Sequence, residues 1–434
     1  MDKILNHTET FCFDCKTVHP AVILQRDKRI IGETTCQKKT KEVILSDDAD
    51  LFLRFRSENI LSSSVIPSDR SFFYHYLSVT DLCNSNCPVC AANSGAKKNA
   101  NHISLQQTEA AAKTALKNHA RTVVLLGGEP SMHPQLPEII SCLRGYGLNV
   151  WMATNGTVIA ENESVLETYI KAGLSKICLQ LDTLDPETHE IIRGNQMVRE
   201  KLKAAKAVTD HGIDLGIVAT VIPDNLFQIE LLCSELLSWE IPPVSIALQG
   251  AAHVGRFASD KGNFITREDI INALSCNSNI TGIFKEDFHV IPAIPLLDIY
   301  LHPDCAAINL LVKESDQWIR ASQLFNWSKF SNLALKSKRI TDRKRQRAYL
   351  YMIIFRSLNR RGVAFLIRSI MHGNTPRIML IGAGAFMRTD FPDMSRMQRC
   401  VSAVITGDCC NSLCDYYRQQ MTKTQPTIHN HSIA

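Results

Sequence analysis

Residues 74–90 read YHYLSVTDLCNSNCPVC, and the interpretation of the chain starts from this stretch. Its first eight residues are apolar and β-rich, which is typical of a buried strand. The next nine residues place Cys83, Cys87 and Cys90 in a C-x3-C-x2-C spacing, with asparagine and proline as loop formers between them. A structural zinc site takes four protein ligands, so three thiolates predict a metal centre with one vacant position.

The same strand pattern recurs downstream and alternates with helical patterns. The expected strands after the first are 122–128, 149–156, 176–182, 215–222 and 244–250, and the expected helices are 104–120, 136–147, 163–173, 199–212 and 226–240. Six such units predict right-handed crossovers and a parallel sheet. Because six units are too few for an eight-stranded barrel, we expect a partial (β/α)6 barrel.

Several polar segments follow these strands directly. GGEP (127–130) ends the second strand, TNG (154–156) ends the third and Asp182 ends the fourth, while the cysteine segment follows the first. In a barrel of this class the chemistry lies at the carboxyl ends of the strands. We therefore expect these segments to converge on one rim.

Composition sets broad limits on compartment and partners. The chain has 434 residues, a formal net charge of +5 and 15 cysteines. Its first residues lack the apolar run of a secretory signal, and no apolar run reaches the roughly 20 residues of a spanning helix. We expect a cytoplasmic protein whose clustered cysteines bind metal, and no nucleic-acid partner.

The three thiolates suit an iron–sulfur cluster better than a single ion. A 4Fe–4S cluster has four irons, so three cysteines leave one iron free to coordinate a small molecule. With GGEP and the repeating strands, this trio resembles the radical S-adenosylmethionine (radical SAM) superfamily over about residues 73–256. The resemblance implies a cluster on Cys83, Cys87 and Cys90 whose open iron binds S-adenosylmethionine.

The resemblance also implies roles for residues at the strand ends. Glycines 127 and 128 would let the backbone approach the methionine moiety, and Glu129 would face its ammonium group. Asn155, Asp182 and Thr220 at the strand ends would bind the ribose hydroxyls or the carboxylate of the cosubstrate. Turn capping is the alternative role for these three residues. The cofactor-binding residues expected in this way are Gly127, Gly128, Glu129, Pro130, Asn155, Asp182 and Thr220.

The N-terminal stretch resembles the rubredoxin-like module of one radical SAM group. That group holds class D methyltransferases acting on a methanopterin precursor and the tetraether-lipid synthase. The matching residues are Cys12, Cys15, Cys36 and the Pro-Ala pair that begins at Pro20. The usual fourth ligand after the third cysteine is missing here, and His19 is the alternative ligand, so an N-terminal metal is an open expectation.

The C-terminal part resembles the same group and carries a third set of cysteines. HPDC (302–305) and FMRTDFPDMSRMQRC (386–400) supply two of them, and a Gly-Arg pair follows the sixth strand in VSIALQGAAHVGR (244–256). An auxiliary iron–sulfur cluster is expected, with structural zinc as the alternative. Its candidate ligands are Cys305, Cys400, Cys414 and either Cys409 or Cys410.

These patterns divide the chain into three parts. Residues 1–66 form a small cysteine-containing module, 67–285 the radical SAM partial barrel, and 286–434 a C-terminal auxiliary-cluster and substrate domain. The last part holds a basic run, KSKRITDRKRQR (336–347), followed by apolar AYLYMIIF (348–355). A solvated helical face is one interpretation of that run, and an acidic substrate or peripheral membrane contact is the other.

Three functions remain open from the sequence. The first is methyl transfer to an unactivated carbon of a small molecule, after S-adenosylmethionine is cleaved to a 5′-deoxyadenosyl radical. The second is radical carbon–carbon coupling of lipid chains, and the third is a non-enzymatic iron–sulfur or zinc protein. Either enzyme would need a reductase such as flavodoxin or ferredoxin, and we assign no catalytic residue beyond the cluster.

Overall fold

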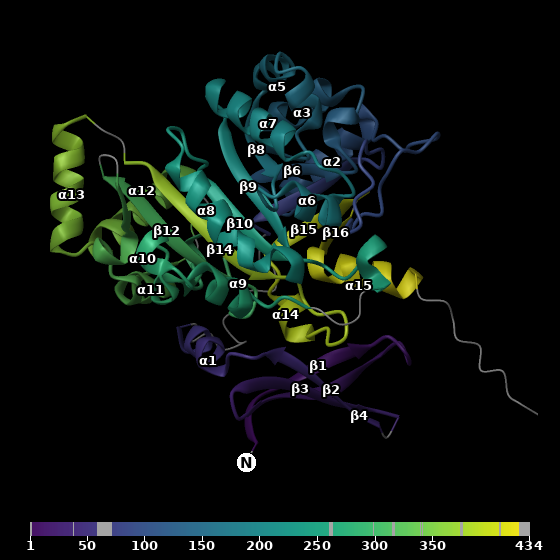
Figure 1. Ribbon diagram of the computed structural model, residues 1–434, viewed down its shortest axis with the longest axis vertical. Coiled ribbons are helices and arrows are strands. Elements are labelled where there is room, and N and C mark those ends of the chain that lie inside the picture. Colours follow the sequence, from purple (N-terminus) through teal and green to yellow (C-terminus); the bar gives the residue numbers. More distant parts are fainter. Residues whose placement is uncertain are drawn as a thin grey trace, which may run out of the picture.

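The structure is a computed structural model and describes most of the chain. The residues outside its description are 1, 38, 59–71, 260–263, 298, 315, 316, 339, 341, 374, 375, 408 and 425–434. Within the described residues there are two sheets, one of twelve strands and one of four (Figure 1). The expected boundary at residues 66 and 67 lies outside the description.

Six parallel strands form the middle of the large sheet and follow one another in sequence order. All six pair in parallel, as the repeating pattern predicts. They are β5 (Tyr74–Thr80), β6 (Thr122–Gly127), β7 (Asn149–Thr154), β8 (Leu174–Gln180), β9 (Asp214–Val221) and β10 (Ser245–Gly250).

Five helices between these strands match the expected positions. Their apolar faces join the strands in one large core. The helices at expected positions are α2 (Leu105–Lys117), α3 (Leu136–Gly145), α5 (Val165–Ala172), α7 (Val198–Asp210) and α8 (Ile229–Ser238). Four further helices were not expected: α4 (Thr157–Glu161) and α6 (Pro186–Arg193) between the strands, and α9 (Arg267–Leu274) and α10 (Ser278–Thr281) after β10. Ser104 and Gln107 form the capping box that starts α2.

The strands are buried on one face and only half-buried on the other. In β9, Ile217 and Ala219 are fully buried under the helices, while Val218 and Thr220 between them are partly exposed. Because side chains alternate along a strand, the less covered face collects every second residue. This face carries polar groups toward the rim where the strands end.

The C-terminal part extends the same sheet on both edges. The strand β14 (Ile378–Ala385) pairs in parallel with β10, and β12 (Ala306–Glu314) pairs antiparallel with β14. At the other edge, β15 (Ser402–Thr406) pairs in parallel with β5. The remaining strands are β11 (His289–Val290), β13 (Gln317–Arg320) and β16 (Cys409–Ser412). Residues far apart in sequence therefore flank the cysteine loop.

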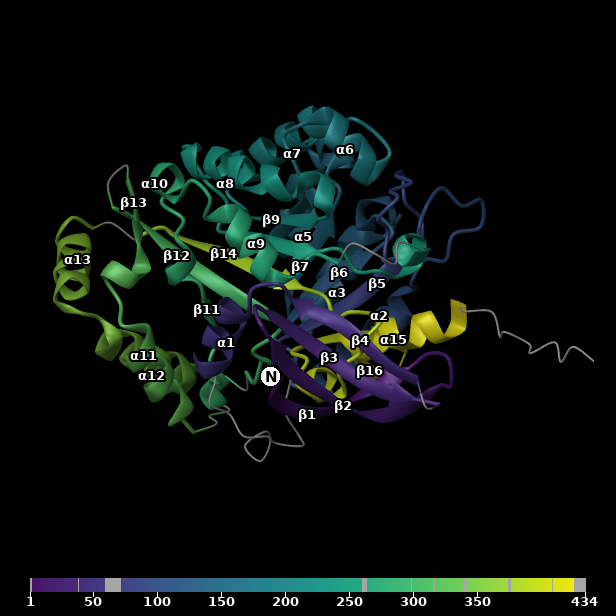
Figure 2. The same ribbon diagram turned by 60° about the horizontal axis from the view of Figure 1, so that its bottom comes forward.

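The N-terminal part is an antiparallel sheet below the large one (Figure 2). Its strands are β1 (Lys3–Cys12), β2 (Thr17–Arg26), β3 (Arg29–Cys36) and β4 (Lys39–Ser46), followed by α1 (Ala49–Glu58). Phe391 from the C-terminal part completes its small core and packs over Gly32. Thr8 donates to Asp393 at 2.7 Å, so the two parts are held together directly.

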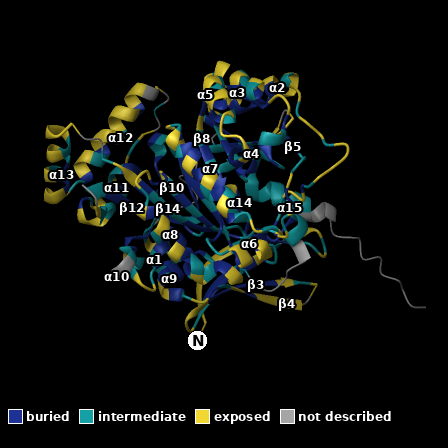
Figure 3. Cartoon of the chain, turned by 45° about the horizontal axis from the view of Figure 1, so that its top comes forward, coloured by how far each residue is buried: buried dark blue, intermediate teal, exposed yellow. Residues whose placement is uncertain are grey.

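Three helices stand at the end of the molecule opposite α15 (Leu413–Thr424) (Figures 1 and 2). They are α11 (Trp327–Leu335), α12 (Arg343–Ser357) and α13 (Arg360–Met371), and α14 (Met394–Gln398) lies near the N-terminal sheet. Much of α12 and α13 is exposed (Figure 3). Among the described residues no helix is both long and apolar enough to span a membrane.

Candidate functional site

The three cysteines of the central loop lie at the carboxyl end of β5, as expected. Cys83 donates its backbone N–H to Gly95 at 3.1 Å, and Cys90 donates to the carbonyl of Cys87 at 3.3 Å. All three thiols are partly buried. Burial raises the pKa of the Cys83 thiol to about 11. These backbone hydrogen bonds fold the loop back on itself.

The GGEP segment holds the start of this loop. Gly128 donates to the carbonyl of Thr80 at 2.7 Å, and Glu129 donates to the carbonyl of Leu82 at 2.8 Å. A Cβ at Gly128 would lie 2.0 Å from the Leu82 carbonyl oxygen, and Gly127 has a φ of +135°. The close approach that requires glycine is to the cysteine loop's own backbone, so these glycines shape the loop whatever they do for a ligand.

The carboxylate of Glu129 is buried and oriented by its neighbours. One oxygen accepts from the hydroxyls of Ser131 and Thr154, each at 2.6 Å, and the other accepts from the backbone N–H of Asn155 at 2.7 Å. Pro130 starts the single turn that carries Ser131. Oε1 also accepts from the backbone N–H of Ser131 at 3.1 Å, whereas the Asn155 bond uses one of the two lone pairs of Oε2. Oε2 therefore keeps a lone pair for one more donor, such as an ammonium group.

Asn155 joins the end of β7 to the cysteine loop. Its side-chain amide donates to Asn84 Oδ1 at 2.8 Å, and its Oδ1 accepts from Thr157 at 2.8 Å. Asn84 donates in turn to the hydroxyl of Thr157 at 2.6 Å. The side chain therefore both caps its own turn and fixes the loop.

Asp182 and Thr220 meet in a buried ion-pair network that sequence reasoning missed. Both oxygens of Asp182 accept from Arg193, at 2.7 and 2.8 Å, and Arg193 also donates to Thr220 at 2.9 Å. Arg193 additionally contacts the thiol of Cys87, whose charge helps to raise the arginine pKa. Arg193 is the last residue of α6 (Pro186–Arg193), a helix that the sequence analysis did not predict.

A second cation lies behind the same rim. Lys201 is almost fully buried and donates to Gln180 at 2.7 Å and to the carbonyl of Asn155 at 2.9 Å. Burial lowers the pKa of Lys201 to about 8, against the opposing effect of Asp182. Together with Arg193 it supplies positive charge beside a site that would hold anionic thiolates.

The Gly-Arg pair after β10 braces the loop from its other side. Arg256 donates to the carbonyl of Cys87 at 2.9 Å and to that of Ser94 at 2.6 Å. Gly255 has a φ of +63°, and a Cβ there would lie 2.4 Å from the Cys90 carbonyl oxygen. Val89, between two cysteines, is buried in an apolar cluster with Ile192.

The number and surroundings of these thiols suit an iron–sulfur cluster. All three are half-buried, and Arg193 and Lys201 supply positive charge beside them. Cysteine thiolates are the usual ligands of such clusters, and three of them leave one iron of a 4Fe–4S cluster open. The residues present therefore fit that cluster.

Three of the five C-terminal cysteines come together. Cys400 shares a hydrogen bond with Cys414, and Cys305 is close enough for its charge to act on both. Arg396 donates to the Cys305 sulfur at 3.3 Å. Cys409 is exposed on β16, and its neighbour Cys410 packs on the large core. The structure thus brings together Cys305, Cys400 and Cys414, and leaves Cys409 and Cys410 on a strand outside the group.

The helix α15 connects the C-terminal cysteines to the central loop. Tyr417 on this helix is partly buried, and its pKa is raised by burial and by the charges of Tyr416, Cys414 and Cys90. Cys414 and Cys90 are therefore both near Tyr417. These two cysteines are 324 positions apart in the sequence, which gave no sign of this.

The N-terminal cysteines are gathered with His19. The ligand atoms of Cys12, Cys15, His19 and Cys36 all lie within 4.8 Å of one another. Cys15 Sγ lies 2.9 Å from His19 Nε2, and 3.5 Å from Cys36 Sγ. The histidine lowers the pKa of Cys15 to about 6. Two hairpins therefore supply three cysteines and one histidine, which are enough ligands for a tetrahedral metal ion. The fourth ligand is a histidine, so a search for a fourth cysteine does not find it.

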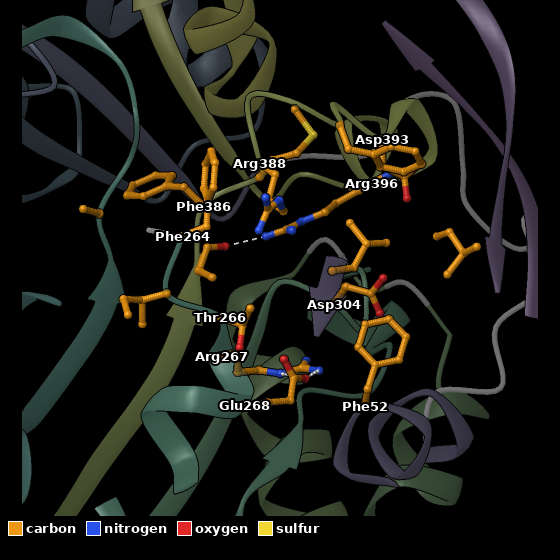
Figure 4. A pocket seen from close by; sticks show the side chains of 17 residues that line it. Phe52, Phe264, Thr266, Arg267, Glu268, Asp304, Phe386, Arg388, Asp393 and Arg396 are labelled. Carbon is orange, nitrogen blue, oxygen red and sulfur yellow. Dashed lines mark hydrogen bonds and ion pairs between the residues drawn. The ribbon is translucent and has the colours of Figure 1, made fainter. Parts of the chain in front are cut away.

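A pocket of about 670 Å³, open to solvent, lies at the ends of β10 and β14 (Figure 4). Its walls come from the N-terminal sheet, the segment after β10 and the segment after β14. Phe264 and Phe386 line one side, and Arg388 stacks over Phe264 with its guanidinium 4.0 Å from the ring centroid. Arg396 reaches from this pocket to Cys305, so the pocket borders the C-terminal cysteine group.

Comparison with known proteins agrees with the geometry of the loop. Residues 77–235 match the model of the radical SAM superfamily. The chain is 28% identical over 228 residues to a 7,8-dihydro-6-hydroxymethylpterin dimethyltransferase of Methanocaldococcus jannaschii, covering 48% of this chain and 45% of that one. It is 29% identical over 185 residues to a GTP 3′,8-cyclase of Klebsiella pneumoniae, covering 42% and 54%.

These alignments are partial. The chain spans about half the length of the curated relatives named above. A GTP 3′,8-cyclase of Vibrio parahaemolyticus aligns more broadly, at 25% identity over 72% of this chain and 95% of that one. Among solved structures, Streptococcus suis SuiB bound to S-adenosylmethionine matches with a TM-score of 0.43 and 17% identity over 59% of this chain and 70% of that one.

Proposed function

Because residues 77–235 form a domain of the radical SAM superfamily, we propose that the protein cleaves S-adenosylmethionine reductively and functionalises an unactivated carbon. One observation carries the proposal. Three half-buried thiols sit in a single loop at the rim of the sheet, braced by GGEP on one side and by Arg256 on the other. A passive metal site has no use for an open position of this kind.

Cys83, Cys87 and Cys90 would hold the cluster. When bound, a 4Fe–4S cluster with an open iron supplies the electron that divides S-adenosylmethionine into methionine and a 5′-deoxyadenosyl radical. The protein orients the cosubstrate. Glu129, already aligned by three neighbours, accepts from its ammonium group, and Arg193 with Lys201 balances the negative charge of the loop.

The pocket beside the rim is the substrate site in this proposal. Phe264, Phe386 and Arg388 offer ring faces and a planar cation, which suit a flat polar heterocycle. The radical takes a hydrogen atom from a substrate C–H bond, which yields 5′-deoxyadenosine and a substrate carbon radical.

Methyl transfer is the outcome we favour for that carbon radical. The support is the partial similarity to a pterin dimethyltransferase together with the aromatic pocket. Carbon–carbon coupling of lipid chains is the second candidate, because α12 and α13 expose large apolar side chains. Each cleavage needs one electron. Methyl transfer from a second S-adenosylmethionine, which leaves as S-adenosylhomocysteine, needs one more electron, whereas coupling joins two carbon radicals without one. A flavodoxin or ferredoxin would deliver these electrons.

The first test is reductive cleavage by protein reconstituted with iron and sulfide under anaerobic conditions. We expect 5′-deoxyadenosine from S-adenosylmethionine and dithionite, at least about tenfold above the Cys87→Ala variant. Cys276→Ala is the matched control, since this exposed thiol lies at the end of α9 away from the loop. Equal yields from the wild-type protein and Cys87→Ala would refute the proposal.

Isotope labelling separates the two candidate outcomes. Extract from cells lacking the protein is incubated with the enzyme and S-adenosylmethionine labelled in its methyl group. Label in a small-molecule product supports methyl transfer. A coupled lipid without label supports carbon–carbon bond formation and removes methyl transfer.

A further inference from the structure

The helices α12 and α13 concentrate positive charge. Residues 343–371 hold no Asp or Glu and eight cations, namely Arg343, Lys344, Arg345, Arg347, Arg356, Arg360, Arg361 and Arg368. The whole chain has a formal net charge of only +5, so the positive charge of this segment is larger than the net charge of the entire molecule. From Lys344 onward these cations are exposed. Arg368 pairs with Glu314 on β12, while Lys344, Arg345, Arg347, Arg356, Arg360 and Arg361 are exposed to solvent.

Large apolar side chains lie among these cations. Tyr351 is 67% exposed and Phe355 is 56% exposed on α12, while Ile370 and Met371 at the end of α13 are 70% and 78% exposed. Tyr349, Met352 and Ile367 are exposed on the same two helices. Scattered single apolar residues are ordinary on a surface, but seven within 23 residues of sequence are not.

The molecule's own packing does not account for this set. On α12 the side chain that enters the core is Ile353, which packs with Phe330 of α11. On α13 it is Phe365, which packs with Val312 and Leu324. Gly362 lets α13 approach the Leu324 carbonyl, where a Cβ would lie 2.1 Å away. The exposed residues are thus a second apolar set, on faces that the fold leaves to solvent (Figure 3).

The combination of cationic and large apolar side chains on α12 and α13 indicates the kind of partner that this surface binds. Cations without acids complement an anionic surface. Aliphatic Met and Ile side chains do not stack on bases, so their exposure is not expected of a nucleic-acid surface. Helices with Lys and Arg beside aromatic and aliphatic residues bind at the interface of a bilayer, with the apolar groups in the acyl boundary and the cations at anionic headgroups.

We propose that α12 and α13 form a docking surface for an anionic lipid bilayer, which would hold the enzyme at a membrane surface. Tyr349, Tyr351, Met352, Phe355, Ile367, Ile370 and Met371 enter the interface, and the surrounding arginines contact the headgroups. The proposal is independent of the radical chemistry, because none of these residues belongs to the cysteine loop or the pocket.

Vesicle flotation of the full-length protein tests the proposal. Phosphatidylcholine vesicles with and without phosphatidylserine are compared at low and high salt. We expect flotation with the anionic vesicles only, reduced by salt because the attraction is screened. Replacing Arg347, Arg356 and Arg361 by Gln should lower the bound fraction by at least about tenfold, since each cation near an anionic surface contributes ~1 kcal/mol.

Control variants elsewhere on the surface show whether the effect is specific to α12 and α13. Tyr351→Ser with Phe355→Ser and Ile370→Ser should also abolish flotation, whereas Phe227→Ser with Leu231→Ser, two exposed apolar residues near α8, should not. Lys113→Gln with Lys117→Gln on α2 is the control for charge. Unchanged thermal unfolding of each variant shows that the fold survives.

Several results would overturn the proposal. They are equal flotation with both vesicle types, no flotation with either, a dimer in solution that the Tyr351/Phe355/Ile370 variant disrupts, or tighter binding to a nucleic acid than to the vesicles. The dimer would assign the surface to a second copy of this chain. None of these outcomes bears on 5′-deoxyadenosine formation, so the two proposals fail separately.

Discussion

At the scale of single residues, the conformation of the cysteine loop depends on glycines, because its backbone contacts leave no room for a Cβ atom. Gly127 and Gly128 leave no room for a Cβ against the backbone of Thr80 and Leu82. Gly255 leaves none against Cys90 on the other side of the loop. At these contacts the backbones touch directly, so a glycine-to-alanine substitution would displace the cysteine loop itself, whatever ligand the site holds.

We therefore expect Gly128→Ala to displace the loop. A Cβ 2.0 Å from the Leu82 carbonyl oxygen forces the two segments apart, and the free energy of unfolding should fall by about 2 kcal/mol or more. Iron bound after reconstitution should fall with it. Denaturant unfolding and iron assay measure the two effects.

The control for Gly128→Ala is Gly145→Ala on α3. A Cβ at Gly145 meets nothing within 4 Å, and its backbone is helical, so stability should stay equal or rise slightly. An iron content for Gly128→Ala equal to that of the wild type would show that the contact does not shape the loop.

At the scale of elements, two hairpins build a site that neither contains alone. The turn between β1 and β2 brings Cys12 and Cys15, β2 itself brings His19, and the end of β3 brings Cys36. Three cysteines and one histidine match a structural zinc site. Whether the module is rubredoxin-like stays a prediction, but its ligand count is complete once His19 is included.

Replacing His19 by Ala should remove one bound metal ion per chain. With three thiolates left, affinity should drop and the N-terminal sheet should unfold at lower temperature, because binding contributes directly to folding in a small metal module. Metal analysis of protein purified without reconstitution, together with thermal unfolding, measures both. His7→Ala on β1 is the matched control, since His7 is not in the group. Identical metal content in the two variants would exclude the site.

At the scale of the whole molecule, the C-terminal part flanks residues 77–235, which match the radical SAM superfamily model, on both edges of the sheet. It adds β14 beside β10 and β15 beside β5, and α15 brings Tyr417 near Cys414 and Cys90. It also contributes Phe391 to the core of the N-terminal sheet. The pocket in Figure 4 takes its walls from all three parts of the chain, so substrate selection is a property of their assembly.

This assembly predicts which C-terminal cysteines hold metal. Iron should persist when Cys83, Cys87 and Cys90 are all replaced by Ala, and should disappear when Cys305, Cys400 and Cys414 are replaced as well. Replacing Cys409 and Cys410 by Ala should leave iron content unchanged, because they lie on β16 apart from the group. Iron and sulfide analysis with Mössbauer spectra distinguishes the variants. Loss of all iron in the first triple variant would exclude a second cluster.

The local sequence was sufficient for the strands, the helices and the central motif. Strand and helix periodicity is a short-range property, and the three cysteines lie within eight residues, so β5 to β10 and the loop on β5 could be predicted. The position of GGEP beside the loop followed from parallel strand order, because neighbouring strands end at the same rim.

Only the tertiary structure decided the partners of those groups. Arg193 meets Asp182 and Cys87, Arg396 meets Cys305, and His19 completes three cysteines through contacts whose spacing no periodicity encodes. Likewise, Cys414 on α15 lies near Cys305, which is 109 positions earlier in the chain. Sequence determines which side chains are available, and packing of distant elements determines which of them share a site.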